Sequence, residues 1–177
     1  MKSLVISPHP DDEVLGAGGT LFKRKNLKEN LLYWIIVTRL KPNSAKKKIL
    51  KRNNEIKKIS KLFGFKKVFQ LNFNTTELDN SSKKKLIQNF SDIFNKIKPN
   101  ELFVPHFSDV HSDHKIVSEV ISSSTKNFRF PYIRKILAYE VLSETDYNLN
   151  RKKIFFPNYY EDITKFLTKK KKCYENL

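Results

Sequence analysis

The 177-residue sequence is poor in several residue types, and each shortage narrows the class of protein. Its 1 cysteine, Cys173, allows no disulfide within the chain and no metal site built on paired cysteines. No apolar run is long enough for a membrane span, and Leu4–Ile6 is too short for a signal peptide. Nothing therefore points to secretion, and we expect a cytoplasmic protein without a membrane span.

Arginine is scarce beside lysine, although the chain is strongly basic. Lys and Arg total 35 against 18 Asp and Glu, a formal charge of +17, but 29 of the basic residues are lysines and 6 are arginines. Such a bias is also what an AT-rich coding sequence produces. Because arginine is the better residue for bidentate phosphate and base contacts, we expect no specific nucleic-acid partner. A polyanion-binding protein remains the alternative, and it predicts binding with a steep salt dependence.

Short apolar runs alternate with longer segments whose apolar residues recur at helical spacing. Hydrophobic residues make up 39% of the chain, enough for the core of a single domain over residues 1–177. The alternation, with short connections, predicts a three-layer α/β domain with a mainly parallel sheet. Strands are expected at 4–6, 31–37, 68–71, 102–104 and 136–139, and helices at 13–25, 45–63 (ended by Gly64), 82–98 and from about 114.

The first expected strand is followed by the sequence Ser7-Pro-His-Pro-Asp-Asp-Glu13. Three of the 4 glycines follow at 16, 18 and 19, and glycine is unfavourable in a helix, so the backbone there should approach a sheet or a ligand closely. Helix capping explains one carboxylate of this segment. It does not explain His9, which lies between two prolines that fix the backbone.

The other three histidines, His106, His111 and His114, all follow the fourth expected strand. A single histidine is more often structural than a ligand, but all four at the ends of two strands favour a functional site. In parallel sheets, ligands bind beyond the carboxyl ends of strands. The two loops converge if strands one and four are neighbours.

Histidines and carboxylates in this arrangement point to a metal. Two imidazoles and a carboxylate with an open position form catalytic zinc sites. The same ligand types hold non-haem iron in oxygenases, so ligand type alone leaves the metal open. Iron oxygenase chemistry is the least favoured, because those sites usually occur in β-rich barrels.

Residues 8–13 resemble the PHPDDE motif of the LmbE-like, or PIG-L-like, metal-dependent deacetylases, and 111–114 resemble their HxDH motif. Residues 139–143 and 157–163 are similar to the branch that contains bacterial cell-surface sugar deacetylases. The resemblance therefore covers nearly the whole chain. It implies a Rossmann-like α/β fold and removal of an acetyl group from an N-acetylated amino sugar or sugar conjugate, in polysaccharide or glycolipid biosynthesis.

The resemblance also implies a role for each residue of the two motifs. The metal ligands would be His9, Asp12 and His114, with Zn²⁺ expected and Fe²⁺ as the alternative. Asp11 would act as the general base, and His111 would polarise the carbonyl and stabilise the oxyanion. Asp113 would orient or charge a neighbouring imidazole.

Three residues near these motifs have less specific signals. Arg52 shares a helical stripe with Ile49 and Ile56, and it is expected either to pair with Glu55 or, slightly favoured, to contact substrate. His106 and Asp109 are expected to tune the metal ligands or to line the pocket.

The C-terminal part of the sequence differs from the family pattern. Members of this branch usually continue further, so we expect a chain shortened at its C-terminus. Its pocket would then be open, completed by a second subunit in a homo-oligomer, or inactive. The apolar residues Ile163, Phe166 and Leu167 predict an amphipathic helix that packs on the sheet or on another subunit.

Overall fold

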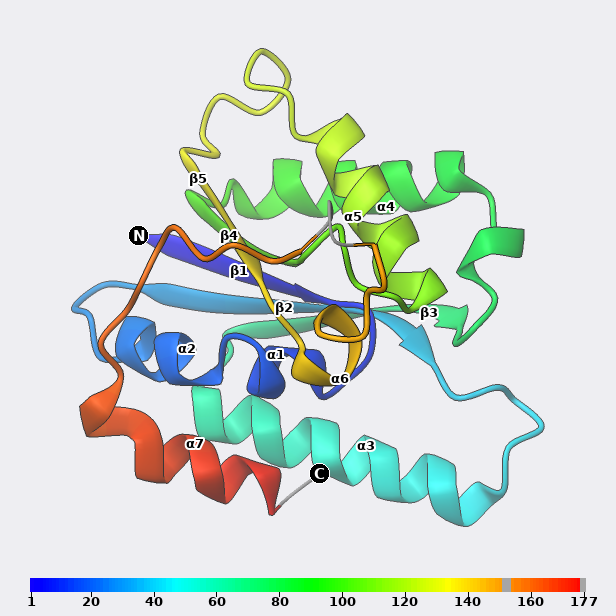
Figure 1. Ribbon diagram of the computed structural model, residues 1–177, viewed down its shortest axis with the longest axis horizontal. Coiled ribbons are helices and arrows are strands. Elements are labelled where there is room, and N and C mark those ends of the chain that lie inside the picture. Colours follow the sequence, from blue (N-terminus) through cyan, green and yellow to red (C-terminus); the bar gives the residue numbers. More distant parts are fainter. Residues whose placement is uncertain (151–153, 176–177) are drawn as a thin grey trace.

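The computed structural model describes residues 1–150 and 154–175 (Figure 1). Its centre is a five-stranded parallel sheet in the order β3-β2-β1-β4-β5. The strands are β1 (Lys2–Ser7), β2 (Leu31–Arg39), β3 (Lys67–Asn74), β4 (Glu101–Pro105) and β5 (Lys135–Tyr139). The helices are α1 (Asp12–Leu15), α2 (Gly18–Lys25), α3 (Lys46–Phe63), α4 (Lys83–Ile97), α5 (Ser112–Ser124), α6 (Leu142–Thr145) and α7 (Leu167–Tyr174), with short 3-10 turns at Leu78–Asn80 and Thr164–Phe166.

Helices cover both faces of the sheet, which confirms the three-layer prediction. Figure 1 shows α1, α2, α3 and α7 on one side and α4 and α5 on the other. Successive residues of a strand point to opposite faces, so Leu4 and Ile6 pack with α4 and α5, whereas Val5 packs with the other layer. The central strands β1, β2 and β4 are buried on both faces and are accordingly rich in apolar residues, whereas the edge strands β3 and β5 are more exposed.

The order of the strands determines where the expected site lies in the fold. β1 pairs with β2 on one side and with β4 on the other, so the direction of the sheet order reverses at β1. In open parallel sheets this reversal opens a crevice beyond the carboxyl ends of the two diverging strands. The loops that follow β1 and β4 therefore lie side by side at one edge of the sheet.

The predicted helix over residues 13–25 is wrong in one respect, because it is two helices that break at Gly16 and Ala17. The backbone of Gly16 lies against the ring of Tyr139, at the end of β5, and against the carbonyl of Glu140. The glycines therefore serve close approach to neighbouring protein segments. Gly64, with φ of 67°, ends α3 as expected.

We expect Gly16→Ala to lower the free energy of unfolding by about 1–3 kcal/mol, because overpacking forces neighbouring atoms apart. A Cβ at this position would lie 2.2 Å from Cδ2 of the buried Tyr139 and 2.8 Å from the carbonyl oxygen of Glu140. Gly18→Ala is the matched control, since its nearest atoms are 3.6 and 3.7 Å away and alanine favours a helix. Urea unfolding measures the stability of the two variants. Equal stabilities would contradict the close approach of Gly16 to Tyr139 and Glu140.

The C-terminal segment holds the first two helices in place. Arg24 of α2 pairs with both oxygens of buried Glu101, at 2.9 and 3.0 Å, and with Glu161 at 2.7 Å. The ammonium of Lys170 in α7 donates to the carbonyl of Leu15, the last residue of α1, at 3.0 Å.

The expectation that the last helix packs on the sheet is corrected, because α1 and α2 lie between α7 and the sheet (Figure 1). Gly18 and Gly19 have no side chains, so the segment that contains Ile163 and Lys170 can approach α2 closely.

Among the described residues, no helix combines the length and the apolar character needed to cross a membrane.

Candidate metal centre

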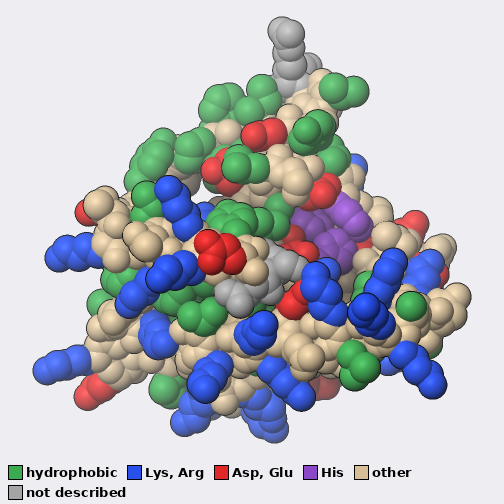
Figure 2. Space-filling view, turned by 90° about the horizontal axis from the view of Figure 1, so that it is seen from below, with side chains coloured by type: hydrophobic (Ala, Val, Ile, Leu, Met, Phe, Trp, Pro, Cys, Tyr) green, Lys and Arg blue, Asp and Glu red, His purple; other side chains and the backbone are tan. Residues whose placement is uncertain are grey.

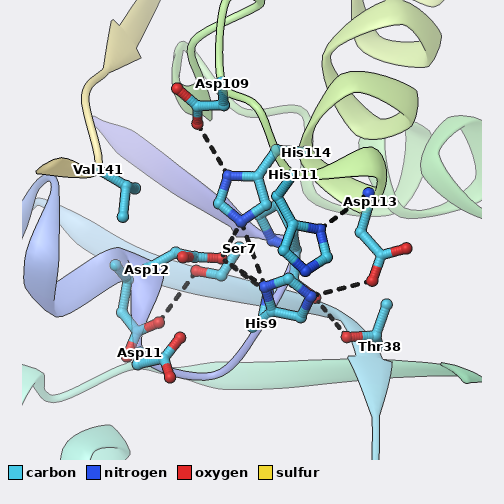
Figure 3. Close-up of polar contacts among 12 residues, drawn as sticks. Ser7, His9, Asp11, Asp12, Thr38, Asp109, His111, Asp113, His114 and Val141 are labelled. Atoms are coloured by element: carbon cyan, nitrogen blue, oxygen red, sulfur yellow. Dashed lines mark hydrogen bonds and ion pairs between the residues drawn. The ribbon is translucent and has the colours of Figure 1, made fainter. Parts of the chain in front are cut away.

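The two sequence motifs meet at the carboxyl edge of the sheet. The β1–α1 connection carries His9 and Asp11, and Asp12 begins α1. The first turn of α5 with the residue before it carries His111, Asp113 and His114. Figure 3 shows His9, Asp12 and His114 close together, with Asp11 to one side. This convergence follows from the pairing of β1 with β4.

Three ligand atoms form a compact triangle. The Nδ1 atom of His9 lies 3.2 Å from Nε2 of His114 and 3.7 Å from Oδ2 of Asp12, and the third side, from His114 to Asp12, is 3.3 Å. Zinc binds nitrogen and oxygen at about 2.0–2.1 Å, so neighbouring tetrahedral ligands lie about 3.3–3.4 Å apart. The triangle has the size of one face of such a coordination shell.

The orientation of His9 is fixed by a carboxylate behind it. Its Nε2 lies 3.0 Å from Oδ2 of Asp113, which also accepts from the backbone N–H of Thr76 at 2.7 Å. Burial raises the pKa of Asp113, but hydrogen bonds from His9 and Thr76 outweigh it and lower that pKa. The ionised carboxylate accepts a hydrogen bond from the Nε2–H group, so the lone pair of Nδ1 faces the centre.

His114 is held in the same way by a different carboxylate. Its Nδ1 lies 2.8 Å from Asp109, which accepts a hydrogen bond from the hydroxyl of Thr145 at 2.6 Å. Burial alone lowers the pKa of His114, but hydrogen bonds and charge from Asp109 and Asp12 raise it to about 10. The surroundings of this ring therefore stabilise one positive charge.

The residues present fit a divalent cation. With the Nε2 proton of His9 bonded to Asp113 and the Nδ1 proton of a neutral His114 bonded to Asp109, two imidazole nitrogens and Oδ2 of Asp12 would face one point. A cation there would supply the positive charge that the surroundings of His114 stabilise. Asp12 is itself held by the backbone N–H of His9 at 2.8 Å. A second geometric combination, His9 with His111 and Asp113, draws on the Asp113 carboxylate, which already accepts from the backbone N–H groups of Thr76 and Leu78 and fixes His9. The first set is therefore the better cation site.

Asp11 lies beside this centre with its carboxylate outside the triangle (Figure 3). Burial and the charge of Asp12 raise its pKa, and Arg52 and His9 oppose that rise. The capping interpretation of this segment is wrong, since Asp11 makes no side-chain cap bond and Asp12 accepts instead from His9. The carboxylate of Asp11 therefore lies beside the ligand triangle and accepts from Arg52 at 3.4 Å.

His111 occupies the N-cap position of α5. Its Nδ1 accepts from the backbone N–H of Asp113 at 3.1 Å, so a neutral ring carries its proton on Nε2. Burial and the neighbouring His9 lower the pKa of His111 and favour this neutral form. The side chain therefore presents a hydrogen-bond donor to the cavity.

A cavity of about 310 Å³ covers the centre, and Arg52 of α3 lies on its wall. The guanidinium of Arg52 donates to the carbonyl of Pro10 at 2.7 Å and lies 3.4 Å from both Asp11 and Glu55. Arg52 therefore pairs with Glu55, and its place on the cavity wall leaves its contact with substrate a prediction.

The structure shows different contacts for Asp109 and His106, the two residues for which the sequence left two roles possible. Asp109 orients His114, whereas His106 bonds to Ser108 and packs against Phe107, away from the triangle. Sequence reasoning missed Thr76 and Thr145, which hold the two orienting carboxylates. Neither has a local signal, because each acts through a contact between distant segments.

We expect Asp109→Asn to weaken metal binding about 10- to 100-fold, because an amide is a poorer acceptor for the Nδ1 proton of His114. Titration of the metal-free protein with Zn²⁺ measures the change. Asp146→Asn, an exposed change one position beyond Thr145, is the control and should bind as the wild type does. Equal Zn²⁺ affinities in the two variants would show that Asp109 does not stabilise metal binding.

A parallel α/β sheet with a candidate metal cluster at its switch point defines a Rossmann-like class of protein. The chain belongs to the PIG-L family, described as GlcNAc-PI de-N-acetylase, whose profile matches residues 4–124. The resemblance in the two motifs is therefore confirmed.

Two deacetylases are similar to this chain. The N,N'-diacetylchitobiose deacetylase from Pyrococcus horikoshii has 26% identity and a TM-score of 0.74, over 99% of this chain and 68% of that one. Diacetylchitobiose deacetylase of Thermococcus kodakarensis is 34% identical over 82 residues, 44% of this chain and 31% of that protein. The match thus spans less than a third of that curated relative.

More distant structures show the fold alone. A deacetylase of teicoplanin biosynthesis has a TM-score of 0.78 at 14% identity, and the hydratase GalB from Pseudomonas putida has 0.75 at 17%. Because one fold carries two kinds of reaction, the reaction of this chain has to be argued from its site.

Proposed function

We propose that this protein is a metal-dependent hydrolase that removes an acetyl group from an N-acetylated amino sugar or a conjugate of one. The convergence of His9, Asp12 and His114 on one point, with Asp11 beside it and outside the ligand set, carries the proposal. Membership of a de-N-acetylase family and similarity to the Pyrococcus diacetylchitobiose deacetylase support this class of substrate.

The ligand set would hold zinc, which favours a site of two imidazoles, one carboxylate and an open position. Iron(II) accepts the same set and is the alternative. A bound divalent cation supplies Lewis acidity, which makes water a stronger acid and the amide carbonyl a better electrophile.

The carboxylate of Asp11 would take the proton of the attacking water and then deliver it to the nitrogen of the leaving amine. A general base works best when its pKa lies near the working pH, and burial together with Asp12 moves the pKa of Asp11 in that direction. Arg52, 3.4 Å from Asp11, would keep this carboxylate oriented.

The Nε2–H group of His111 would donate to the oxygen of the substrate carbonyl as negative charge develops there. A fixed donor in a buried site stabilises such a charge without having to reorganise. The backbone N–H of Asp113 holds the ring from behind. Asp113 contributes indirectly, by orienting His9.

Metal analysis combined with acetate release tests this function. The purified protein should contain about one divalent ion per chain and should release acetate from at least one member of a panel of N-acetylhexosamine derivatives. Bound metal without acetate from any member would contradict the proposal and favour a catalytically impaired relative. Salt-sensitive binding of DNA that survives metal removal would instead support the polyanion-binding alternative.

A further inference from the structure

The basic residues of the chain are concentrated in two segments. Residues 41–67, which contain α3, and residues 164–175, which contain α7, together hold 16 basic residues and 2 acidic ones. Residues 83–126, which contain α4 and α5 of the opposite layer, hold 7 basic residues and 5 acidic ones. An AT-rich coding sequence raises the number of lysines along a whole chain, but it does not place them on one side of the fold.

The two basic helices form one surface. Figure 1 shows α3 and α7 together at the lower edge of the molecule. They are neighbours over α2, since a Cβ at Gly18 would lie 3.6 Å from Lys170 of α7 and 3.7 Å from Phe63 of α3. Figure 2 looks onto this side and shows Lys and Arg side chains spread over it. We call the exposed residues of α3 and α7 the basic face.

The outward side of α3 is built mainly from lysine and leucine. Opposite the buried Ile56 and Ile59, the exposed positions that recur at helical spacing are Lys47, Leu50, Lys51, Lys58, Lys61 and Leu62. Glu55, the acidic residue of α3, is buried and pairs with Lys51 and Arg52. The helix therefore presents positive charge and apolar groups in the same direction.

Apolar side chains lie among the lysines of both helices. Four large ones are between 37% and 63% exposed: Leu50, Leu62, Leu167 and Tyr174. At a bilayer with anionic lipids, lysines attract the headgroups and apolar side chains enter the boundary between headgroups and acyl chains. A nucleic acid offers no such boundary and favours arginine, and the two segments contain one arginine, Arg52, which bonds to Pro10 and Glu55. The combination favours a lipid surface.

We propose that the basic face binds the surface of bilayers that contain anionic lipids, with the lysines on the headgroups and the exposed leucines inserted shallowly. The axis of α3 then lies along the surface, because its lysines and leucines point the same way. Salt screens the attraction between lysines and anionic lipids, so the docking is peripheral and reversible. The inference is independent of the proposed function, since neither metal nor substrate takes part.

Sedimentation with lipid vesicles tests the inference. The full chain is mixed with vesicles of phosphatidylcholine alone or of phosphatidylcholine with phosphatidylglycerol, at low and at high salt. We expect it to sediment with the anionic vesicles and not with the neutral ones, and to be released by high salt. A protein that binds neither kind of vesicle, or both kinds equally, overturns the inference.

Charge reversal locates the contact. The double variant Lys47→Glu with Lys61→Glu, in the first and last turns of α3, should bind the anionic vesicles about 30-fold or more weakly, from the contribution of two lysines near such a surface. Lys84→Glu with Lys96→Glu makes the same change in the first and last turns of α4 and should bind nearly as well as the wild type. Equal losses in the two variants overturn the inference, because net charge would then be responsible. Thermal unfolding checks that both variants are folded.

A leucine variant distinguishes a lipid surface from a nucleic acid. Leu50→Asn should weaken binding to the anionic vesicles about 5-fold or more, because this side chain no longer enters the bilayer boundary. Leu149→Asn, the same change at a 97% exposed leucine outside the basic face, should have no effect. Vesicle binding that is unchanged in Leu50→Asn overturns the lipid assignment. Binding of a DNA duplex at least as tight as that of the anionic vesicles also overturns it and supports a nucleic-acid partner.

Discussion

Replacing Asp11 by asparagine should lower kcat for acetate release about 100- to 10,000-fold, the usual contribution of a general acid–base group. Asparagine has nearly the same size and can still accept from Arg52, but it cannot take a proton from water. Because Asp11 lies outside the ligand triangle, the metal content should stay at the wild-type value. Rates and metal content measured on one preparation give both results.

The matched control is Asp92→Asn, the same chemical change on the exposed surface of α4, where Asp92 accepts from Gln88. It should leave both rate and metal content unchanged. An Asp11→Asn protein with nearly full activity would exclude Asp11 as the base. Loss of metal in that variant would show instead that Asp11 is a ligand.

Replacing a metal ligand should have a different effect from replacing Asp11. The protein should lose its metal, and activity should be lost as a consequence. Asp12→Ala and His114→Ala should each reduce the metal from about one equivalent per chain to near zero. Both side chains are almost fully buried, at 3% and 1% exposure, so no neighbouring surface group can take their place easily. Metal analysis after dialysis measures the loss directly.

Thermal unfolding separates loss of the metal from loss of the fold. Added Zn²⁺ should raise the melting temperature of the wild type, because a ligand that binds only the folded state stabilises it, and should leave Asp12→Ala unchanged. His106→Gln is the control histidine, because His106 contacts Ser108 and Phe107 rather than the triangle. Full metal content in both variants would show that Asp12 and His114 are not metal ligands.

Much of the local structure could be predicted from the sequence because its causes are local. The spacing of Ile49, Ile56 and Ile59 marks the buried side of α3, and Gly64 supplies the left-handed residue that ends it. The break between α1 and α2 could not be predicted this way. It depends on the contact of Gly16 with Tyr139, a residue far along the chain.

The sequence by itself determined which side chains are available for chemistry: His9, Asp11 and Asp12 after one strand, and His111, Asp113 and His114 after another. The tertiary structure decided that β1 and β4 are neighbours, which brings His9 within 3.0 Å of Asp113, 104 positions away. It also decided which carboxylate orients each imidazole. Strand pairing and side-chain hydrogen bonds between distant segments depend on how the layers pack, and the local sequence does not specify which segments become neighbours.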